Sequence, residues 1–206
     1  MVVSDPFAKF YITAKVHKKP WKTRPIVSIS GSLLHGLGCW VDKILQPFTK
    51  IIPSYIKSLV DLKDLLLNLP PLPTTASLFT CDAVSMYTNI DTGHAIAQIR
   101  QYLRLNKLGT LVDRSAVLEA LHIVMYNNMF EFGDTFWLQI DGTAMGVSPS
   151  CSYATLYFAP HENSMLQKYP ELRFYRRYID DVIGIWIPTT NTDATRWESF
   201  QSDMNT

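Results

Sequence analysis

The chain has 206 residues, of which 47% are hydrophobic and 12% aromatic, so it is long and apolar enough for one sizeable core. This composition excludes an intrinsically disordered chain. The formal net charge is only +1, which excludes a uniformly basic or acidic protein and leaves the local distribution of charge as the informative feature.

Strands and helices are both predicted in the first part of the chain. Residues 10–16 and 24–29 have the apolar, β-branched composition of two strands joined as a hairpin. Residues 33–52 are predicted to be helical because apolar side chains recur at helical spacing, and residues 61–69 form a second, shorter helix. Residues 77–83 are predicted to form a buried strand.

The order of the later elements predicts the fold class. Asp91 can cap a helix that runs to about residue 104, and another helix is expected over residues 115–125. Residues 130–139 are predicted to form a hairpin with a Gly-Asp turn, and residues 148–162 a helix. Residues 191–206 are polar and predict no particular element. This order predicts an α+β fold in which helices cover one face of an antiparallel sheet.

Adjacent acids form the most informative stretch of the sequence. Asp180 and Asp181 lie between two apolar, β-prone runs, so they are predicted at the tip of a hairpin, and Asp82 ends another apolar run. Adjacent carboxylates repel each other and need a compensating cation, and Mg²⁺ prefers oxygen ligands and usually brings substrate phosphates. Three carboxylates on neighbouring strand ends therefore predict a two-metal site for phosphoryl transfer. An isolated Asp-Asp pair is more often a solvated turn, and the apolar flanks favour the site.

Basic residues gather at two places. Asp5 is the only acid before Val41, whereas the same stretch contains several basic residues, which include the turn 18–22. A second cluster precedes Asp180. Such patches suit a polyanion, although a solvated face is the commoner meaning of a lysine run. The members are Lys9, Lys15, Lys18, Lys19, Lys22 and Arg24 in the first cluster, and Arg173, Arg176 and Arg177 in the second.

The cysteine spacing and the apolar runs indicate whether the chain is disulfide-bonded, secreted or inserted in a membrane. Cys39, Cys81 and Cys151 are widely separated and fit neither a zinc site nor a disulfide framework, so they are expected to be small core residues. No secretory signal and no long uncharged apolar run is visible, so neither secretion nor membrane insertion is expected.

Five motifs, in order, resemble those of reverse transcriptases. Residues 82–90 (DAVSMYTNI) resemble their first palm motif, residues 141–146 (DGTAMG) the second, and residues 178–181 (YIDD) the third. Residues 15–18 (KVHK) and 24–28 (RPIVS) resemble the paired strands of the fingers. The likeness is greatest to Penelope-like retroelement reverse transcriptases, which are relatives of telomerase.

The resemblance covers about residues 10–186 and implies an RNA-directed DNA polymerase of a retroelement. Its α+β fold would be a polymerase palm with a partial fingers subdomain. Residues 1–60 would form the partial fingers with the basic hairpin, residues 61–190 the palm, and residues 191–206 the polar end of a chain without a thumb. No segment resembles the primer grip or thumb of the family, so we expect the central core of a longer protein.

The resemblance assigns metal binding to the acids. Asp82 and Asp180 would bridge two Mg²⁺ ions, for which Mn²⁺ could substitute, and Asp181 would support them. The backbone carbonyl of Ala83 could add a ligand. These residues would catalyse the transfer of dNTPs onto a primer 3′-hydroxyl.

The resemblance also assigns nucleotide binding. Lys15 and Arg24 would bind the incoming triphosphate, since the guanidinium fork suits phosphate. Tyr87 would exclude a 2′-hydroxyl by its bulk, and Met145 and Gly146 would line the nucleotide pocket. Without the resemblance, Lys15 is equally consistent with an ordinary surface lysine, Tyr87 is better explained as a core tyrosine, and Gly146 could belong to a plain turn.

The implied partners are an RNA template, a DNA primer and dNTPs. Lys18, Lys19 and Lys22 of the basic turn would contact nucleic acid, and Trp21 could stack on a base, although an exposed turn tryptophan without a ligand is equally consistent. The resemblance implies a nuclear or cytoplasmic location, because elements of this family make cDNA at chromosomal sites.

Two other functions are consistent with the same sequence features. An RNA-directed RNA polymerase shares the palm, but the bulk of Tyr87 argues against it because such enzymes need room for the 2′-hydroxyl. A polymerase-derived nucleic-acid-binding remnant without catalysis is the other, and the intact Asp82, Asp180 and Asp181 argue against it.

Overall fold

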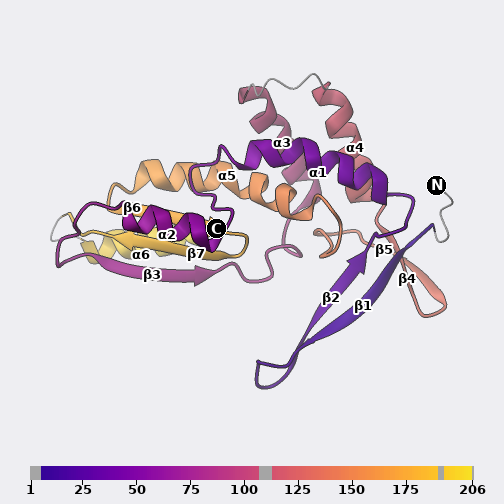
Figure 1. Ribbon diagram of the computed structural model, residues 1–206, viewed down its shortest axis with the longest axis horizontal. Coiled ribbons are helices and arrows are strands. Elements are labelled where there is room, and N and C mark those ends of the chain that lie inside the picture. Colours follow the sequence, from indigo (N-terminus) through magenta and orange to yellow (C-terminus); the bar gives the residue numbers. More distant parts are fainter. Residues whose placement is uncertain (1–5, 107–112, 190–192, 206) are drawn as a thin grey trace. The chain divides into compact units, whose positions relative to one another are not determined.

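The chain folds into two compact units, each built from two separate stretches of sequence (Figure 1). The computed structural model describes residues 6–106, 113–189 and 193–205. The first unit is formed by Met1–Thr49 and Ser85–Tyr157, and the second by Lys50–Val84 and Phe158–Thr206. The two units interleave along the chain, and the division into fingers, palm and polar end at residues 60 and 190 stays a prediction.

The first unit contains a four-stranded sheet and three complete helices. The sheet has the order β2-β1-β4-β5. β1 pairs antiparallel with β2 and parallel with β4, whereas β4 and β5 form an antiparallel hairpin. Both predicted hairpins are therefore confirmed. The elements are β1 (Ala8–Lys15), β2 (Lys22–Ser28), α1 (His35–Thr49), α3 (Thr92–Leu105), α4 (Arg114–Tyr126), β4 (Met129–Phe132) and β5 (Thr135–Leu138), followed by the start of α5 (Ser150–Lys168).

Side chains fix where α3 and α4 begin. The Asp91 carboxylate accepts a hydrogen bond from the His94 N–H at 2.6 Å, and the Asp113 carboxylate accepts one from the Ser115 N–H at 2.9 Å. Each satisfies a backbone donor that has no partner within its helix. The predicted helix cap at Asp91 is confirmed.

A compact core holds the first unit together. It joins β1 and β2 to α4 and to the turn that precedes α5. Because Ala144 and Val147 are buried in this core, the Met145–Gly146 turn between them is held against β2. The buried residues are Ala8, Val27, Ile29, Val124, Ala144 and Val147.

The second unit contains an antiparallel sheet with the order β3-β7-β6. A short segment extends the outer side of β6, since the Arg177 N–H donates to the Ser54 carbonyl at 2.7 Å and the Ile56 N–H donates to the Arg177 carbonyl at 3.1 Å. The elements are α2 (Leu59–Leu67), β3 (Ser77–Asp82), the end of α5, β6 (Leu172–Tyr178), β7 (Asp181–Trp186) and α6 (Asp193–Met204).

An aromatic cluster covers one face of this sheet. Trp186 of β7 contacts Trp197 and Phe200 of α6, with ring centroids 5.1 and 5.4 Å apart, and Tyr169 at the end of α5 packs on Phe200 at 5.4 Å. These three pairs are edge-to-face or tilted, which is the favourable geometry for aromatic rings. The predicted α+β fold, with helices on one face of an antiparallel sheet, is confirmed.

Four details differ from the sequence predictions. β3 is an exposed edge strand, not a buried one: Leu78 is 67% exposed, because only Phe79 and Cys81 turn toward the core. α6 forms where no element was predicted, and α5 continues to Lys168. Cys39 and Cys151 are exposed, so the expectation of core cysteines fails for both.

None of the helices in the described part of the chain combines the length and the apolar composition needed to cross a membrane.

Gly184 is the position in β7 at which the second sheet has no room for a side chain. It pairs with Phe79 of β3, and a Cβ atom there would lie 2.2 Å from the Phe79 ring. That ring is itself confined by Trp197 and Phe200, with centroid distances of 5.2 and 5.5 Å.

We predict that Gly184→Ala lowers the free energy of unfolding by about 1–3 kcal/mol, because the added methyl group overpacks the sheet. Urea denaturation measures this change. Leu78→Ala, on the exposed face of the adjoining strand, is the control and should change stability by no more than about 0.5 kcal/mol. Equal stability of Gly184→Ala and the wild type would mean that the Phe79 ring moves aside at little cost.

Candidate active site

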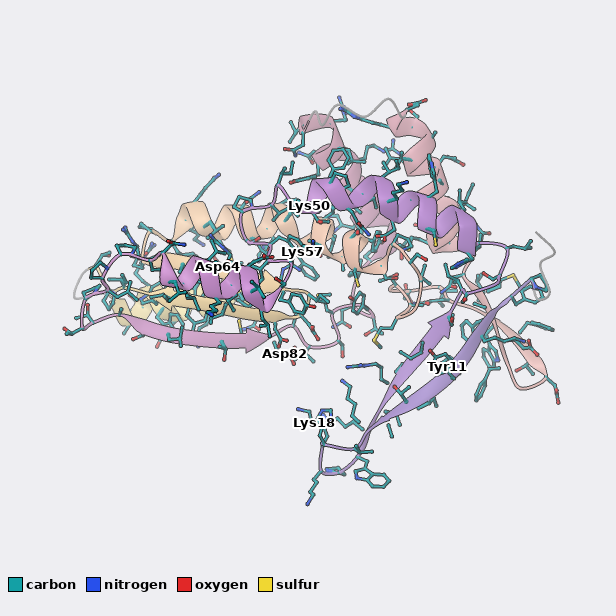
Figure 2. The ribbon with its side chains drawn as sticks, in the orientation of Figure 1. Tyr11, Lys18, Lys50, Lys57, Asp64 and Asp82 are labelled. Carbon is teal, nitrogen blue, oxygen red and sulfur yellow. The ribbon has the colours of Figure 1, made fainter. Side chains whose placement is uncertain are left out.

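The register of the second sheet brings two of the predicted acids together. Asp82 at the end of β3 pairs directly with Asp181 at the start of β7, and Asp181 pairs on its other side with Tyr178 of β6. Residues paired across antiparallel strands point to the same face of the sheet. Asp82 and Asp181 therefore share a face, and both are exposed. Figure 2 shows Asp82 at the carboxyl end of its strand.

Asp180 occupies the turn that joins β6 to β7. The Ala83 N–H donates to the Asp180 carbonyl at 2.9 Å, which ties the end of β3 to the turn. Ile179, the preceding residue, has a φ of +57°, which is unusual for a β-branched side chain. The predicted hairpin with both acids at its tip is confirmed, and its backbone is strained.

The three predicted acids place like negative charge at the end of β3 and in the β6–β7 turn. In the described part of the chain, no lysine or arginine forms an ion pair with Asp82, Asp180 or Asp181. Like charges opposite each other on neighbouring strands are destabilising. Burial, and then the charge of Asp82, raises the pKa of the Cys81 thiol, so this cysteine remains a neutral neighbour. Carboxylates without a cationic partner are compatible with a bound cation, and the binding of one stays a prediction.

Their chemistry fits Mg²⁺, which takes carboxylate and carbonyl oxygens and keeps several waters. Among the residues that the structure describes, no three acidic, histidine or cysteine side chains are gathered into a group that could hold a metal ion. The sheet register pairs two acids, and the third lies in the turn beside them. Metal ligation by Asp82, Asp180, Asp181 and the Ala83 carbonyl stays a prediction.

A buried ion pair lies next to the acidic turn, and the sequence did not predict it. Arg177 and Glu162 are both 3% exposed, with Arg177 Nε 2.5 Å from Glu162 Oε1. The prediction that Arg177 belongs to a basic surface patch is therefore wrong, because its charge is neutralised in the interior. The aromatic residues Phe174, Tyr175 and Tyr178 around it were the available signal that this strand is largely buried.

The first unit gathers the predicted nucleotide-binding residues. In the β1–β2 hairpin, Lys15 pairs with Lys22, and Thr13 pairs with Arg24. Since paired residues share a face, and residues two apart on a strand do so as well, Lys15, Lys22 and Arg24 lie on one face of the hairpin. The Arg24 side chain is exposed and that of Lys15 half-buried. This face is strongly basic.

The Met145–Gly146 turn packs on the same hairpin. The Val27 N–H donates to the Met145 carbonyl at 2.9 Å. Gly146 has a φ of +115°, and a Cβ atom there would lie 2.6 Å from the Val27 carbonyl oxygen. Only glycine allows this approach. Gly146 thus lies against β2, and its place in a nucleotide pocket stays a prediction.

Tyr87 packs against the start of residues 141–146, the motif that contains the Met145–Gly146 turn. Its carbonyl accepts a hydrogen bond from the Thr143 N–H at 2.7 Å, and its hydroxyl lies 3.2 Å from the Cys151 sulfur. The side chain is half-buried, which agrees with neither a fully buried core tyrosine nor a free surface residue.

The tip of the hairpin is exposed. The side chains of Lys18, Lys19, Trp21 and Lys22 all face solvent, and that of Trp21 is 73% exposed. Lys18 lies at the turn in Figure 2. The predicted nucleic-acid-binding residues are therefore accessible.

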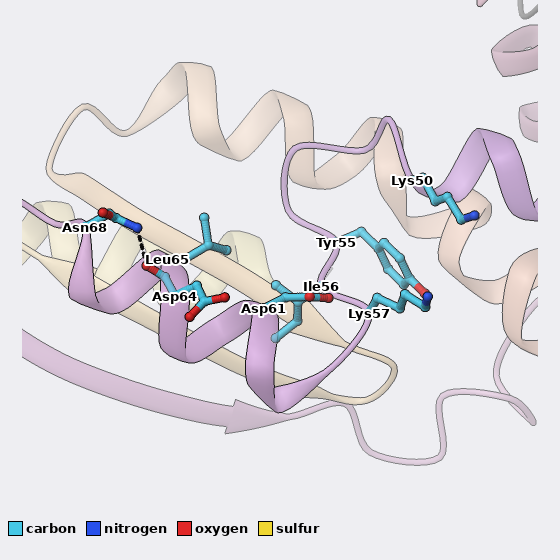
Figure 3. A pocket seen from close by; sticks show the side chains of 8 residues that line it. All are labelled: Lys50, Tyr55, Ile56, Lys57, Asp61, Asp64, Leu65 and Asn68. Carbon is cyan, nitrogen blue, oxygen red and sulfur yellow. Dashed lines mark hydrogen bonds between the residues drawn. The ribbon is translucent and has the colours of Figure 1, made fainter.

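The second unit also contains an open pocket of about 400 Å³ between the segment before α2 and α2 itself (Figure 3). Its lining is polar, with lysines and aspartates in balance, and the Asn68 amide donates to the Asp64 carbonyl at 2.8 Å. None of the predicted site residues lines it. The lining residues are Lys50, Tyr55, Ile56, Lys57, Asp61, Asp64, Leu65 and Asn68.

Comparison with known proteins gives a fold but no family. No protein-family profile and no sequence among the curated proteins matches the chain. A telomerase from Candida tropicalis in complex with a fragment of telomeric RNA has a TM-score of 0.68 at 14% identity, covering 96% of this chain and 39% of that one. The corresponding Candida albicans complex gives 0.64 at 11% identity, covering 96% and 40%. BmCPV RNA-dependent RNA polymerase gives 0.66 at 12% identity, covering 98% and 20%. The chain thus has a polymerase-like palm and fingers fold and spans less than half the length of these proteins.

Because Asp82 and Asp181 face each other, a substitution that removes their repulsion should stabilise the fold and weaken metal binding. Asp82→Asn removes the repulsion across β3 and β7, so in a chelator it should raise the free energy of unfolding by about 0.2–1 kcal/mol. Mg²⁺ should then stabilise the wild type more than the variant, because only the wild type keeps the full donor set. Urea denaturation with and without Mg²⁺ measures both effects. A variant that is less stable than the wild type in the chelator would contradict the repulsion.

Proposed function

We propose that this chain is the fingers–palm core of an RNA-directed DNA polymerase of a retroelement, resembling the Penelope-like group. The observation that carries the proposal is the pairing of Asp82 with Asp181 at the end of the second sheet, with the Asp180 turn tied to Ala83. Exposed carboxylates of like charge without a cationic partner in the described chain are suited to metal-dependent phosphoryl transfer.

In this proposal Asp82 and Asp180 hold two Mg²⁺ ions, supported by Asp181 and the Ala83 carbonyl. Bound Mg²⁺ would favour ionisation of the primer 3′-hydroxyl and neutralise charge on the triphosphate and the leaving pyrophosphate. Mn²⁺ could take the same oxygen ligands. The carboxylates themselves orient the ions, and their exposure leaves room for substrate.

The first unit would bind the nucleotide. Arg24 and Lys15 share a face of the hairpin and offer the positive charge that a triphosphate needs. The Met145–Gly146 turn, which packs on that hairpin, would line the pocket. Tyr87 would exclude nucleotides with a 2′-hydroxyl.

RNA is the proposed template, and a DNA primer and dNTPs are the proposed substrates. The telomerase structures with a similar fold contain an RNA fragment, which supports a nucleic-acid partner here. The exposed Lys18, Lys19, Trp21 and Lys22 would contact it by charge and stacking. A nuclear or cytoplasmic location agrees with this function.

An RNA-directed RNA polymerase is the second candidate, and the fold shared with the BmCPV RNA-dependent RNA polymerase favours it. Tyr87 favours the first, since its ring would occupy the space of a ribose 2′-hydroxyl. A nucleic-acid-binding module without catalysis is the third outcome that experiment must distinguish.

Primer extension tests the proposal directly. With Mg²⁺, the chain should add dNTPs to a DNA primer on an RNA template, and Asp180→Asn should lower the rate at least about 10³-fold, because it removes several kcal/mol of electrostatic stabilisation. Asp64→Asn, an exposed acid on α2, is the control and should be fully active. If neither this chain nor a version lengthened at both ends extends the primer, the catalytic proposal is wrong and the binding module remains.

Tyr87 should decide between deoxynucleotides and ribonucleotides. We predict that Tyr87→Ala lowers the preference for dNTPs over NTPs by about 10–100-fold, because it removes the clash with the 2′-hydroxyl. Ratios of kcat/KM for the two nucleotides measure it. Tyr87→Phe keeps the ring and loses only the hydroxyl beside Cys151, so it should retain the preference. An unchanged ratio in Tyr87→Ala would contradict the assignment.

A further inference from the structure

We propose that the buried ion pair between Arg177 and Glu162 positions the acidic turn at Ile179–Asp181 for metal binding. Arg177 and Glu162 are thus positioning residues that act through the turn, not ligands themselves. The consequence for catalysis rests on the proposed function, whereas the consequence for the turn does not.

The guanidinium of Arg177 reaches the turn directly. Its Nη1 donates to the Ile179 carbonyl at 3.0 Å, while Nε and Nη2 donate to the two oxygens of Glu162 at 2.5 and 3.2 Å. One planar group therefore joins a helix to the turn in a fixed geometry. Hydrogen bonds from a charged donor are the stronger kind, and burial strengthens them further.

The turn needs such a partner because its backbone is unfavourable. Ile179 has a φ of +57°, where the β-branched side chain is crowded and few residues other than glycine are found. The bond from Arg177 fixes its carbonyl, and the Ala83 N–H fixes that of Asp180. Strained residues persist where the surroundings over-determine them, and they gather at functional sites.

Glu162 is in turn held from two other directions. The Ser54 hydroxyl donates to its Oε2 at 2.6 Å, and the Tyr175 hydroxyl donates to its Oε1 at 3.2 Å. Burial, with the adjacent charge of Glu162, raises the pKa of Tyr175, so its hydroxyl keeps the proton that it donates. The carboxylate therefore cannot rotate away from Arg177.

A buried guanidinium needs acceptors for its remaining N–H groups, and here one of these acceptors is the Ile179 carbonyl of the acidic turn. Buried pairs are weak evidence for stability, since well-packed apolar residues often serve as well. The bond from Nη1 to Ile179 links the pair to the residue just before Asp180 and Asp181. This link is what supports a positioning role.

The test compares two arginines of the second unit. Arg196 also binds a glutamate through both oxygens, with Nε 3.1 Å from Glu171 Oε1 and Nη2 2.9 Å from Oε2, but it belongs to α6 and not to the acidic turn. Arg177→Lys and Arg196→Lys both keep the charge and lose the planar fork. Arg196→Lys is therefore the control for the loss of the fork, at a more exposed position.

Two readouts need no catalysis. Amide hydrogen exchange at residues 179–181 should become about tenfold faster in Arg177→Lys, and the Kd for Mn²⁺ should rise about 10–100-fold, as when residues that orient metal ligands are changed. Arg196→Lys should stay within about twofold of the wild type in both. Wild-type exchange and wild-type Mn²⁺ affinity in a folded Arg177→Lys variant would overturn the inference.

Two complications have their own answers. If Arg177→Lys does not fold, Ser54→Ala replaces it. This change loses one hydrogen bond to Glu162 and should raise the Kd for Mn²⁺ about threefold, and a wild-type Kd overturns the inference.

If the wild type neither binds Mn²⁺ nor extends primers, the proposed function fails, yet exchange at the turn still decides the role of Arg177. If the wild type is active, Arg177→Lys should raise the Mg²⁺ concentration for half-maximal extension about tenfold and leave the KM for dNTP unchanged.

Discussion

The second unit has to hold two carboxylates opposite each other against their mutual repulsion. Asp82 and Asp181 are fixed opposite each other by the register of β3 and β7, at an exposed end of the sheet. The strands resist this repulsion because their other face is closed by the aromatic cluster of α5 and α6. The turn is held separately, by the Ala83 N–H and by the Arg177 guanidinium. The cluster and these two hydrogen bonds thus hold like charges and a strained turn in place.

The first unit meets a different constraint, which is the close approach of backbone to backbone. Gly146 lies so near the Val27 carbonyl that no side chain fits, and the Thr143 N–H is bonded to the Tyr87 carbonyl. These contacts link three motifs that lie far apart in the sequence. The basic face of the hairpin, with Lys15 and Arg24, therefore belongs to the same compact unit as Tyr87 and the Met145–Gly146 turn.

The likeness to telomerase and viral polymerase structures, at 11–14% identity, shows how few residues this fold requires. An apolar pattern of the right period and a few turn residues are sufficient to specify such a sheet and its helices. Because one fold supports several activities, function has to be argued from the site. In the function proposed here, the carboxylates would support metal-dependent transfer, and Tyr87 would decide the choice of sugar.

Local features of the sequence determined the hairpins, the cap at Asp91 and the position of Asp180 and Asp181 at a tip, since these depend on residues within a few positions of one another. Long-range packing decided the rest. β3 is an exposed edge because it has one neighbouring strand in the sheet. Residues 193–204 are helical because the helix lets Trp197 and Phe200 pack in the aromatic cluster. Arg177 reads as a surface charge in sequence, yet it is buried because Glu162, Ser54 and the turn carbonyl of Ile179 surround it. A charge can be buried only where its partners converge, and the sequence does not state which distant residues will be neighbours.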